Sequence, residues 1–463
     1  MWKKCERLLD RSLSSSVFTW RQVLDLMVPG ILDSLSIMFI NALITALISK
    51  NGEVSVAAVA LVGPITYLIS CVFNGIGAGG TVIVAQCLGK DDPKLIRTSI
   101  GMTLWMTVLS GCIVCMPLLL FPVFVLNLIY PHADPAVMEK ACMYLSGSSW
   151  SILFFTVYIA AFNVLRGQGE SRKCLILSVI INVAYLLFSI LFLNVLDMDI
   201  FGSAMALIVA RAIGAACALA YLFLINPKVR MRFIEIFSFE KTLFKANFQV
   251  SIPLGLEQIC ISLGSIVSQM YMIPLGTTAI ATNSIAFSMM GVLYSPAMSI
   301  SNLSVTVVGR CIGAGKQDEA YTYGKRFNVL AMLLIAAAAL IFYPMMDILL
   351  TQYQTTAEIS QMTKMLLICS LPSLLLFWPM SMTLPSTLRA ASDSLYPTIV
   401  SLTVLWTVSI GIGYILAIHV GLGLWGVWIA NWSSWLTRSV AFLIRFRSKK
   451  WLTKSKLVES PAN

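Results

Sequence analysis

Charged residues are scarce in this chain, and their scarcity indicates its class. Lysine, arginine, aspartate and glutamate make up 11% of the 463 residues, whereas hydrophobic residues make up 58%. Soluble domains carry roughly 25% charged residues, because their surfaces face water. The mean hydropathy of +0.85 therefore predicts a protein whose surface mostly faces lipid.

Residues suited to catalysis and metal binding are also few. The chain has 2 histidines, His132 and His419, and neither lies at a spacing that suits a metal site. It has no GxxxxGK[ST] loop to cradle the phosphates of ATP. Its 11 cysteines are scattered, and buried cysteine usually behaves as a small hydrophobe. We therefore predict that the chain is not an enzyme, holds no metal and binds no cofactor.

What the sequence does contain is a series of long apolar segments. A membrane-spanning helix needs about 20 mainly apolar residues, and an isolated span must satisfy its own backbone hydrogen bonds in lipid. Twelve segments meet this test, at residues 24–48, 55–85, 98–121, 136–162, 174–195, 202–225, 248–273, 279–308, 327–349, 360–387, 397–418 and 423–446. The prediction is an all-α, polytopic membrane protein.

Lysine and arginine are distributed unevenly among the loops that join these segments. In multi-pass proteins the cytoplasmic loops carry the excess of basic residues. Both tails and every second loop are rich in them, whereas the alternate loops offer only Lys50, Lys140 and Lys364. We therefore predict the cell inner (plasma) membrane, with both termini cytoplasmic. The net charge of +11 then comes from basic loops that face anionic lipid head groups, and it does not indicate a nucleic-acid surface.

The second half of the chain repeats the first with an offset of 224 residues. The pairs that match, the last one residue out of register, are Pro29 with Pro253, Asp33 with Glu257, Gly52 with Gly276, Cys87 with Cys311, Gly202 with Gly426, and Leu165-Arg166 with Leu388-Arg389. An even number of spans per half gives both halves one orientation, as in parallel-repeat transporters.

This repeat predicts two pseudo-symmetric bundles of six helices each. The predicted parts are an amphipathic cytoplasmic tail at 1–22, an N-terminal bundle at 23–225, a cytoplasmic linker at 226–246, a C-terminal bundle at 247–446 and a basic cytoplasmic tail at 447–463. Substrate sites lie at the interfaces of such repeats.

Short motifs in both halves resemble those of a known family. They are Gly52-Glu53, Ala57-Ala58-Val59, Val62-Gly63-Pro64-Ile65, Ala85-Gln86-Cys87-Leu88-Gly89-Lys90, Leu165-Arg166-Gly167-Gln168-Gly169-Glu170, Phe201-Gly202-Ser203-Ala204, Gly276-Thr277 and Val308-Gly309-Arg310-Cys311-Ile312-Gly313-Ala314-Gly315. In order, spacing and duplication the pattern resembles the multidrug and toxic compound extrusion (MATE) transporters. The resemblance implies twelve helices in two bundles and a V-shaped cavity that alternates between the two sides. It also implies export of bulky, often cationic or amphipathic compounds, driven by inward H⁺ or Na⁺.

The chain departs from that family at the acids that its members commonly carry in the membrane. Ile44 stands where an aspartate often follows the first-span proline, and Leu186 stands where an acid often follows the asparagine of the fifth span. The tenth span, at 366–384, contains no acid. The family's coupling residues are therefore not transferable to this chain.

Two other acids lie well within predicted spans. Asp33 and Glu257 each follow the proline of their half by four residues, among apolar neighbours. Charged groups inside spans are costly and are functional hypotheses by default. A carboxyl group buried in this way is a candidate for exchanging a proton near neutral pH. Alternatively, Glu257 and Gln258 offer the hard oxygen donors that suit Na⁺.

A structural role is the rival interpretation of these acids. Arg211 lies in the sixth span and Arg438 in the twelfth, and helix counting places them at the depths of Asp33 and Glu257 respectively. Two buried ion pairs would then tie helices together in each half. A direct contact with substrate is the third alternative.

Further polar positions within or beside spans are candidates for a cavity lining. The principal ones are Asn41, Asn182, Gln258 and Asn283. Interhelical hydrogen bonding is the common structural use of such residues in membranes.

Together these features predict a monomeric secondary transporter that exports small organic molecules in exchange for H⁺ or Na⁺. Its partners would be the small-molecule substrate and membrane lipids, with no nucleic acid. A lipid-linked oligosaccharide flippase of the same superfamily is one alternative, although such proteins carry more cavity charges than this chain shows. A non-transporting membrane sensor is the other.

Overall fold

The computed structural model describes residues 14–48, 53–130, 135–196, 198–225, 235, 238–351, 353 and 355–455. Within these ranges every regular element is a helix, which confirms the all-α prediction. Each predicted span falls on one helix or on consecutive helices, and among the described residues 10 of these are long and apolar enough to cross a membrane. Much of the predicted linker at 226–246, and parts of the predicted tails, lie outside the described residues.

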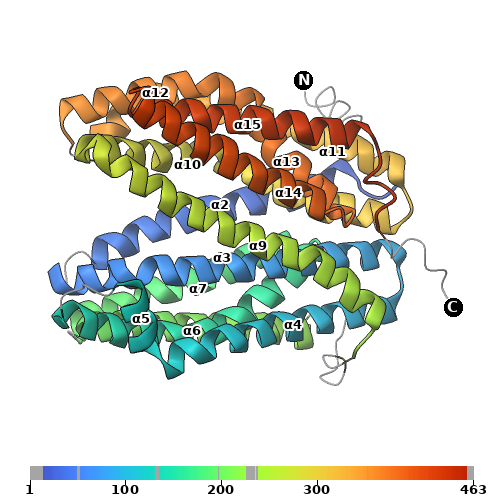
Figure 1. The fold of residues 1–463 in the computed structure, drawn as a ribbon. Coiled ribbons are helices and arrows are strands. Elements are labelled where there is room, and N and C mark those ends of the chain that lie inside the picture. Colours follow the sequence, from blue (N-terminus) through green and yellow to red (C-terminus); the bar gives the residue numbers. More distant parts are fainter. Residues whose placement is uncertain are drawn as a thin grey trace. The chain divides into compact units, whose positions relative to one another are not determined.

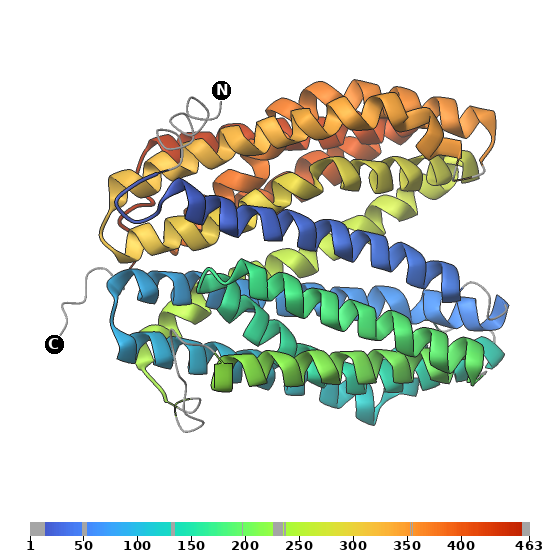
Figure 2. The ribbon, with the colours of Figure 1, turned by 180° about the vertical axis from the view of Figure 1, so that it is seen from behind.

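The chain forms two compact units, and within each unit Figures 1 and 2 show helices running side by side. The N-terminal unit comprises residues 28–255, and the C-terminal unit comprises residues 256–463 together with 1–27. Helices of the N-terminal unit are α3 (Glu53–Lys90), α4 (Pro93–Leu120), α5 (Pro122–Ile129), α6 (Pro135–Gly167), α7 (Ser171–Ser189), η1 (Ile190–Val195), α8 (Asp199–Ala220) and η2 (Tyr221–Ile225). Those of the C-terminal unit are η4 (Ile273–Leu275), α10 (Thr277–Gly313), α11 (Gln317–Thr351), α12 (Ala357–Leu376), α13 (Trp378–Ala390), α14 (Leu395–Val404), η5 (Leu405–Ile412), η6 (Ile415–His419) and α15 (Leu424–Arg447). Divided between the two units are α2 (Trp20–Ile48) and α9 (Lys241–Met272).

The two divided helices change unit next to their prolines. In α2 the N-terminal unit begins at Val28, beside Pro29. In α9 it ends at Gly255, just beyond Pro253. Proline removes a backbone hydrogen bond and its ring crowds the preceding turn, so it bends a helix. The two repeat-related prolines therefore mark where the chain passes from one unit to the other.

The turns that follow repeat-related helices have the same geometry in both units. Asp91 follows α3 with φ 58°, and its counterpart Gly315 follows α10 with φ 73°. Glycine adopts this left-handed conformation without cost, whereas other residues rarely do. Asp92, next in the chain, caps α4 by accepting hydrogen bonds from the N–H groups of Lys94 and Leu95 at 2.9 and 3.3 Å.

The helices α6 and α13 also end alike. Each is followed by a residue in the left-handed region, Gly169 (φ 76°) in one unit and Ser392 (φ 64°) in the other. The N–H of the next residue, Glu170 or Asp393, then donates to the carbonyl five residues back, at 2.9 and 3.2 Å. Both turns are Schellman motifs, so the internal repeat extends to backbone hydrogen bonding.

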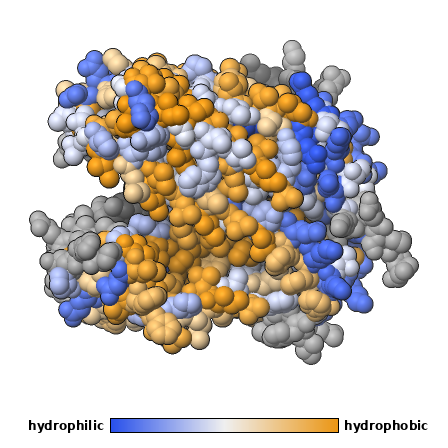
Figure 3. All heavy atoms as spheres, in the orientation of Figure 1, coloured by the Kyte–Doolittle hydropathy of each residue, from blue (hydrophilic) through white to orange (hydrophobic). Residues whose placement is uncertain are grey.

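The outer faces of the helices carry large apolar side chains. On α11 the exposed ones recur at helical spacing, and Leu340 is 78% exposed. They are Val329, Leu333, Leu340, Ile341 and Ile348. Figure 3 shows such apolar residues along the helices, with hydrophilic residues gathered where α15 ends and α11 begins. A soluble monomer rarely exposes so much apolar surface, and lipid covers it without penalty.

Close packing inside the N-terminal unit depends on glycines of α3. A Cβ added at Gly79 would lie 2.0 Å from Oγ of Ser251, on α9, and 2.9 Å from its backbone nitrogen. That hydroxyl donates to the carbonyl of Ile76 at 3.0 Å, which joins α9 to α3. Small residues at helix interfaces allow such approach in membranes.

The segment before α2 packs on the C-terminal unit. The hydroxyl of Tyr323, on α11, donates to Oγ of Ser15 at 3.0 Å, and Ser16 donates to Glu319. Phe18 is buried and meets Tyr323 edge to face, with ring centres 6.4 Å apart. The end of the predicted cytoplasmic tail is therefore a packed part of this unit.

Candidate functional site

Glu257 is buried in the C-terminal unit within a polar set drawn from three helices. It lies on α9 and is 6% exposed. Arg389, in the last turn of α13, places Nη2 2.5 Å from Oε2 of Glu257. Thr398, on α14, donates its hydroxyl to the same oxygen at 3.0 Å. A cation and a hydroxyl therefore hold this carboxylate at once.

Asp33 is the corresponding buried acid of the N-terminal unit. It lies on α2 and is also 6% exposed. The Ser178 hydroxyl of α7 and the charge of Arg166, in the last turn of α6, both favour the ionised form of this carboxyl group. Its second oxygen, Oδ1, is buried and has no hydrogen-bond partner in the described part of the chain. Buried polar atoms are nearly always paired, so this oxygen is open to a proton or a cation.

The two acids have repeat-related surroundings. Asp33 and Glu257 correspond at the offset of the repeat, and Arg166 and Arg389 correspond one residue out of register. The hydroxyls that act on them, Ser178 and Thr398, come from the corresponding helices α7 and α14. Each unit therefore carries one set of a buried acid, an arginine at a helix end and a hydroxyl. We call these the Asp33 set and the Glu257 set.

Arg211 does not take the place that helix counting predicts for it beside Asp33. Its Nη1 donates to Oγ of Ser151 at 2.8 Å, and its guanidinium lies 4.5 Å from the ring centre of Phe155. These contacts correct the predicted pairing, because depth along a helix does not show which face the side chain occupies.

Arg438 comes closer to its predicted role. Its charge acts on Glu257, but the ion pair of Glu257 is made by Arg389. Arg438 instead directs Nε at the carbonyl of Ser434 on its own helix, at 3.5 Å. It is an additional cation near the Glu257 set, and the direct partner that helix counting predicts is replaced by Arg389.

The polar cavity candidates fall in different places. Asn182 donates to the carbonyl of Ser178 at 2.8 Å, which puts it beside the Asp33 set. Gln258 is half-buried next to Glu257. Asn283 accepts a hydrogen bond from Nε1 of Trp428 at 3.1 Å, an interhelical contact. Asn41 lies on α2, but its side chain is outside the described residues.

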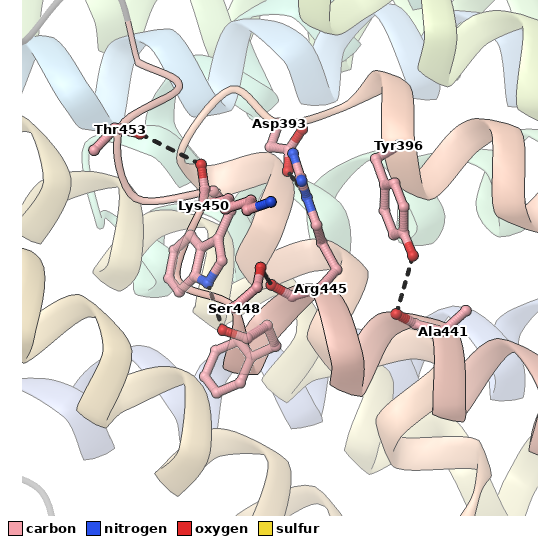
Figure 4. Close-up of polar contacts among 9 residues, drawn as sticks. Asp393, Tyr396, Ala441, Arg445, Ser448, Lys450 and Thr453 are labelled. Atoms are coloured by element: carbon pink, nitrogen blue, oxygen red, sulfur yellow. Dashed lines mark hydrogen bonds and ion pairs between the residues drawn. The ribbon is translucent and has the colours of Figure 1, made fainter.

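The loop after Arg389 is held in place by α15. Nε of Arg445 lies 2.8 Å from Oδ2 of Asp393, and its guanidinium lies over the ring of Tyr396, 5.0 Å from the ring centre. Figure 4 shows Arg445 directed at Asp393, with the hydroxyl of Tyr396 pointing to the carbonyl of Ala441 at 3.2 Å. These contacts hold the backbone at the end of α13, which carries Arg389, and leave the guanidinium itself free to change rotamer.

These sets can exchange a proton or hold a monovalent cation. Their donors are carboxylate and hydroxyl oxygens, which suit H⁺ or Na⁺. In the part of the chain that the structure describes, no group of three or more His, Cys, Asp or Glu side chains is placed to hold a metal ion. The signal that could have found the arginines was in the sequence, since the repeat itself pairs Leu165-Arg166 with Leu388-Arg389.

Comparison with known proteins gives one consistent result. The chain matches the family described as MatE twice, over residues 29–191 and 253–415, and the two matches differ by the offset of the internal repeat. It is 23% identical over 426 residues to a probable multidrug resistance protein YoeA of Bacillus subtilis, covering 87% of this chain and 90% of that one. It is 22% identical over 439 residues to a probable multidrug resistance protein NorM of Thermotoga maritima, covering 93% of each.

Solved structures show the same fold. One is described as the outward-facing conformation of a multidrug resistance MATE family transporter of the MOP superfamily; the TM-score is 0.84 at 18% identity, covering 95% of this chain and 96% of that one. The crystal structure of MATE in the straight conformation gives a TM-score of 0.82 at 18% identity, covering 95% and 97%.

Proposed function

Because the chain belongs to the MatE family, we propose that it is a secondary active transporter that exports bulky organic compounds through alternating access. Its curated relatives include proteins named for multidrug resistance, which supports cationic or amphipathic substrates. The family match over both halves supports transport, because duplicated bundles are typical of transporters. An enzymatic role is not supported, since the matching proteins are transporters.

Coupling of export to inward H⁺ or Na⁺ is assigned in this proposal to Asp33 and Glu257. The observation that carries it is the duplication of the acid, arginine and hydroxyl set in the two units. Oδ1 of Asp33, which has no hydrogen-bond partner among the described residues, is the atom that would take the ion first.

The Glu257 set gives this coupling a physical route. Arg389 neutralises Glu257 in this state, so a proton or Na⁺ must compete with the guanidinium for the carboxylate. Movement of Arg389 away from Glu257 would open the carboxylate, and its return would expel the ion. An arginine that lies in the last turn of α13 can change position without unfolding the helix core.

The protein is proposed to act as a monomer in the plasma membrane, with both termini in the cytoplasm. Support comes from the excess of basic residues in the two tails and in every second loop. Lipids would contact the exposed apolar side chains of helices such as α11.

The test is efflux of a fluorescent cationic dye from proteoliposomes under an imposed H⁺ or Na⁺ gradient. We expect the wild type to export dye only when a gradient is present. Asp33→Asn and Glu257→Gln should each abolish the efflux that the gradient drives. Asp347→Asn is the matched control, because its side chain is 74% exposed and pairs only with Lys364 among the described residues.

Two results would contradict the proposal. Gradient-driven efflux that persists in both acid variants would remove the acids from coupling. Absence of efflux in the folded wild type, across a broad panel of compounds and both ions, would contradict the exporter itself.

A further inference from the structure

A cavity on the C-terminal unit combines apolar and basic residues. It has a volume of about 550 Å³ and lies between α11, α13 and α15. Val329, Leu384 and Leu443 supply apolar surface, and Lys325, Asn328 and Arg447 supply polar groups. The cavity lies near the last turn of α15, at the end of the unit where hydrophilic residues gather (Figure 3).

Positive charge collects around this cavity. Nζ of Lys325 lies 4.5 Å from the ring centre of Tyr321, and Nζ of Lys449 lies 4.9 Å from the same centre. Arg447 lines the cavity and is exposed. Across the described ranges, none of these three cations is within ion-pair distance of a carboxylate. Cations without a carboxylate partner are available to an anionic ligand.

Asn328 adds a second, independent feature. Its side chain lines the cavity, the residue is 8% exposed, and Oδ1 is buried without a hydrogen-bond partner among the described residues. Such orphan atoms are uncommon in native proteins. An amide oxygen accepts hydrogen bonds, so the missing partner is a donor such as a hydroxyl.

The N-terminal unit provides an internal comparison. Its own cavity, of about 590 Å³, is lined by Leu104, Trp105 and Leu219, among others. These three correspond at the repeat offset to Asn328, Val329 and Leu443 of the C-terminal cavity. Every described residue that lines the N-terminal cavity is hydrophobic. The scaffold is therefore shared, and among the residues that the structure describes in the two cavities only those of the C-terminal cavity include polar and basic groups.

We propose that the C-terminal cavity binds an anionic phospholipid whose head group carries hydroxyls, as in phosphatidylglycerol. Lys325 and Arg447 take the phosphate, and the amide of Asn328 turns toward the cavity so that Oδ1, buried and unpaired in this state among the described residues, accepts a hydrogen bond from a head-group hydroxyl. An acyl chain lies against Val329, which is 53% exposed, and Leu443. Basic side chains at the ends of spans occupy the depth of lipid head groups, which favours a lipid over a free anion.

Native mass spectrometry of the full-length protein tests this site. The probes are phosphatidylglycerol, phosphatidic acid and phosphatidylcholine with identical acyl chains. We expect wild type to retain phosphatidylglycerol in preference to phosphatidylcholine. Lys325→Ala and Arg447→Ala should each weaken phosphatidylglycerol binding by about fivefold, because a basic residue near an anionic surface contributes about 1 kcal/mol. Asn328→Leu should remove the preference for phosphatidylglycerol over phosphatidic acid, which lacks the hydroxyls.

Lys364→Ala is the matched control, because Lys364 is an exposed lysine that pairs with Asp347; it should leave lipid binding unchanged. Thermal melting of each variant checks that it is folded. Equal retention of phosphatidylglycerol and phosphatidylcholine by wild type would overturn the proposal, as would equal effects of Lys325→Ala and Lys364→Ala. Displacement of the lipid by millimolar inorganic phosphate would also overturn it, since the cavity would then be a free-anion site.

Discussion

Nη2 of Arg389 lies 2.5 Å from Oε2 of Glu257, and both side chains are largely buried, at 15% and 8% exposure. Burial makes this pair costly to break, because a lone charge left in the protein interior loses its hydration without compensation. The same pair limits access to the carboxylate, so an ion can bind Glu257 only if this stabilising contact is broken. Nε of Arg389 is buried without a partner in the described ranges, which leaves the guanidinium incompletely satisfied in this state.

Removing one partner of this pair should destabilise the protein more than removing both. Arg389→Met and Glu257→Gln should each lower the free energy of unfolding by about 3–5 kcal/mol, because each leaves a buried charge unpaired. The double variant should lose less than the sum of the two. Thermal melting in detergent measures the stability of all three variants. Additive losses would show that Arg389 and Glu257 have no interaction energy with each other.

Asp33→Asn should cost less stability than Glu257→Gln. Oδ1 of Asp33 has no hydrogen-bond partner in the described part of the chain, so neutralising the acid should lose about 1 kcal/mol at most, the worth of a single hydrogen bond. The same melting assay compares the two variants. A loss at Asp33 as large as that at Glu257 would mean that Arg166 pairs with Asp33 as tightly as Arg389 pairs with Glu257.

Gly79→Ala should lower the melting temperature. The added Cβ would meet Oγ and the backbone of Ser251, and overpacking of this kind costs about 1–3 kcal/mol. Gly63→Ala is the control on the same helix, because outside the adjoining helix backbone no described atom lies within 4 Å of a Cβ built there. Equal melting temperatures for the two variants would contradict close packing of α9 on α3.

Asp91→Gly should stabilise the protein. Asp91 holds φ 58° where its repeat counterpart is glycine, and a left-handed conformation costs a non-glycine residue roughly 1–2 kcal/mol. The greater freedom of glycine in the unfolded chain offsets part of this gain. The reverse change, Gly315→Asp, should lower the melting temperature. A lower melting temperature for Asp91→Gly would contradict backbone strain at Asp91.

Trp428→Phe should leave Oδ1 of Asn283 without the donor that it now accepts at 3.1 Å. An unsatisfied buried acceptor costs about 1–3 kcal/mol, and the smaller ring adds a packing loss. In the chain that already carries Trp428→Phe, Asn283→Leu should therefore recover part of the melting temperature. If Asn283→Leu restores none of the melting temperature, the loss caused by Trp428→Phe is due to packing alone.

Much of the candidate site was accessible from sequence. Asp33 and Glu257 stand out as acids inside apolar segments, since the cost of burying a charge makes such residues rare. Their arginines were not found as partners, because helix counting gives the depth of a side chain and not its direction. Arg211 turned out to face Ser151 and Phe155, although the repeat already placed Arg166 and Arg389 in matching positions.

The sequence by itself determined the class, the helices and the repeat of this protein. Apolar length and the need to satisfy backbone hydrogen bonds in lipid allow few alternatives to spanning helices, and periodic matches show a duplication directly. Only the tertiary structure decided which helix faces meet, and so which cation neutralises Glu257 and why Asn328 lines a cavity. Those choices depend on contacts between residues far apart in the chain, such as Glu257 with Arg389, which no local pattern encodes.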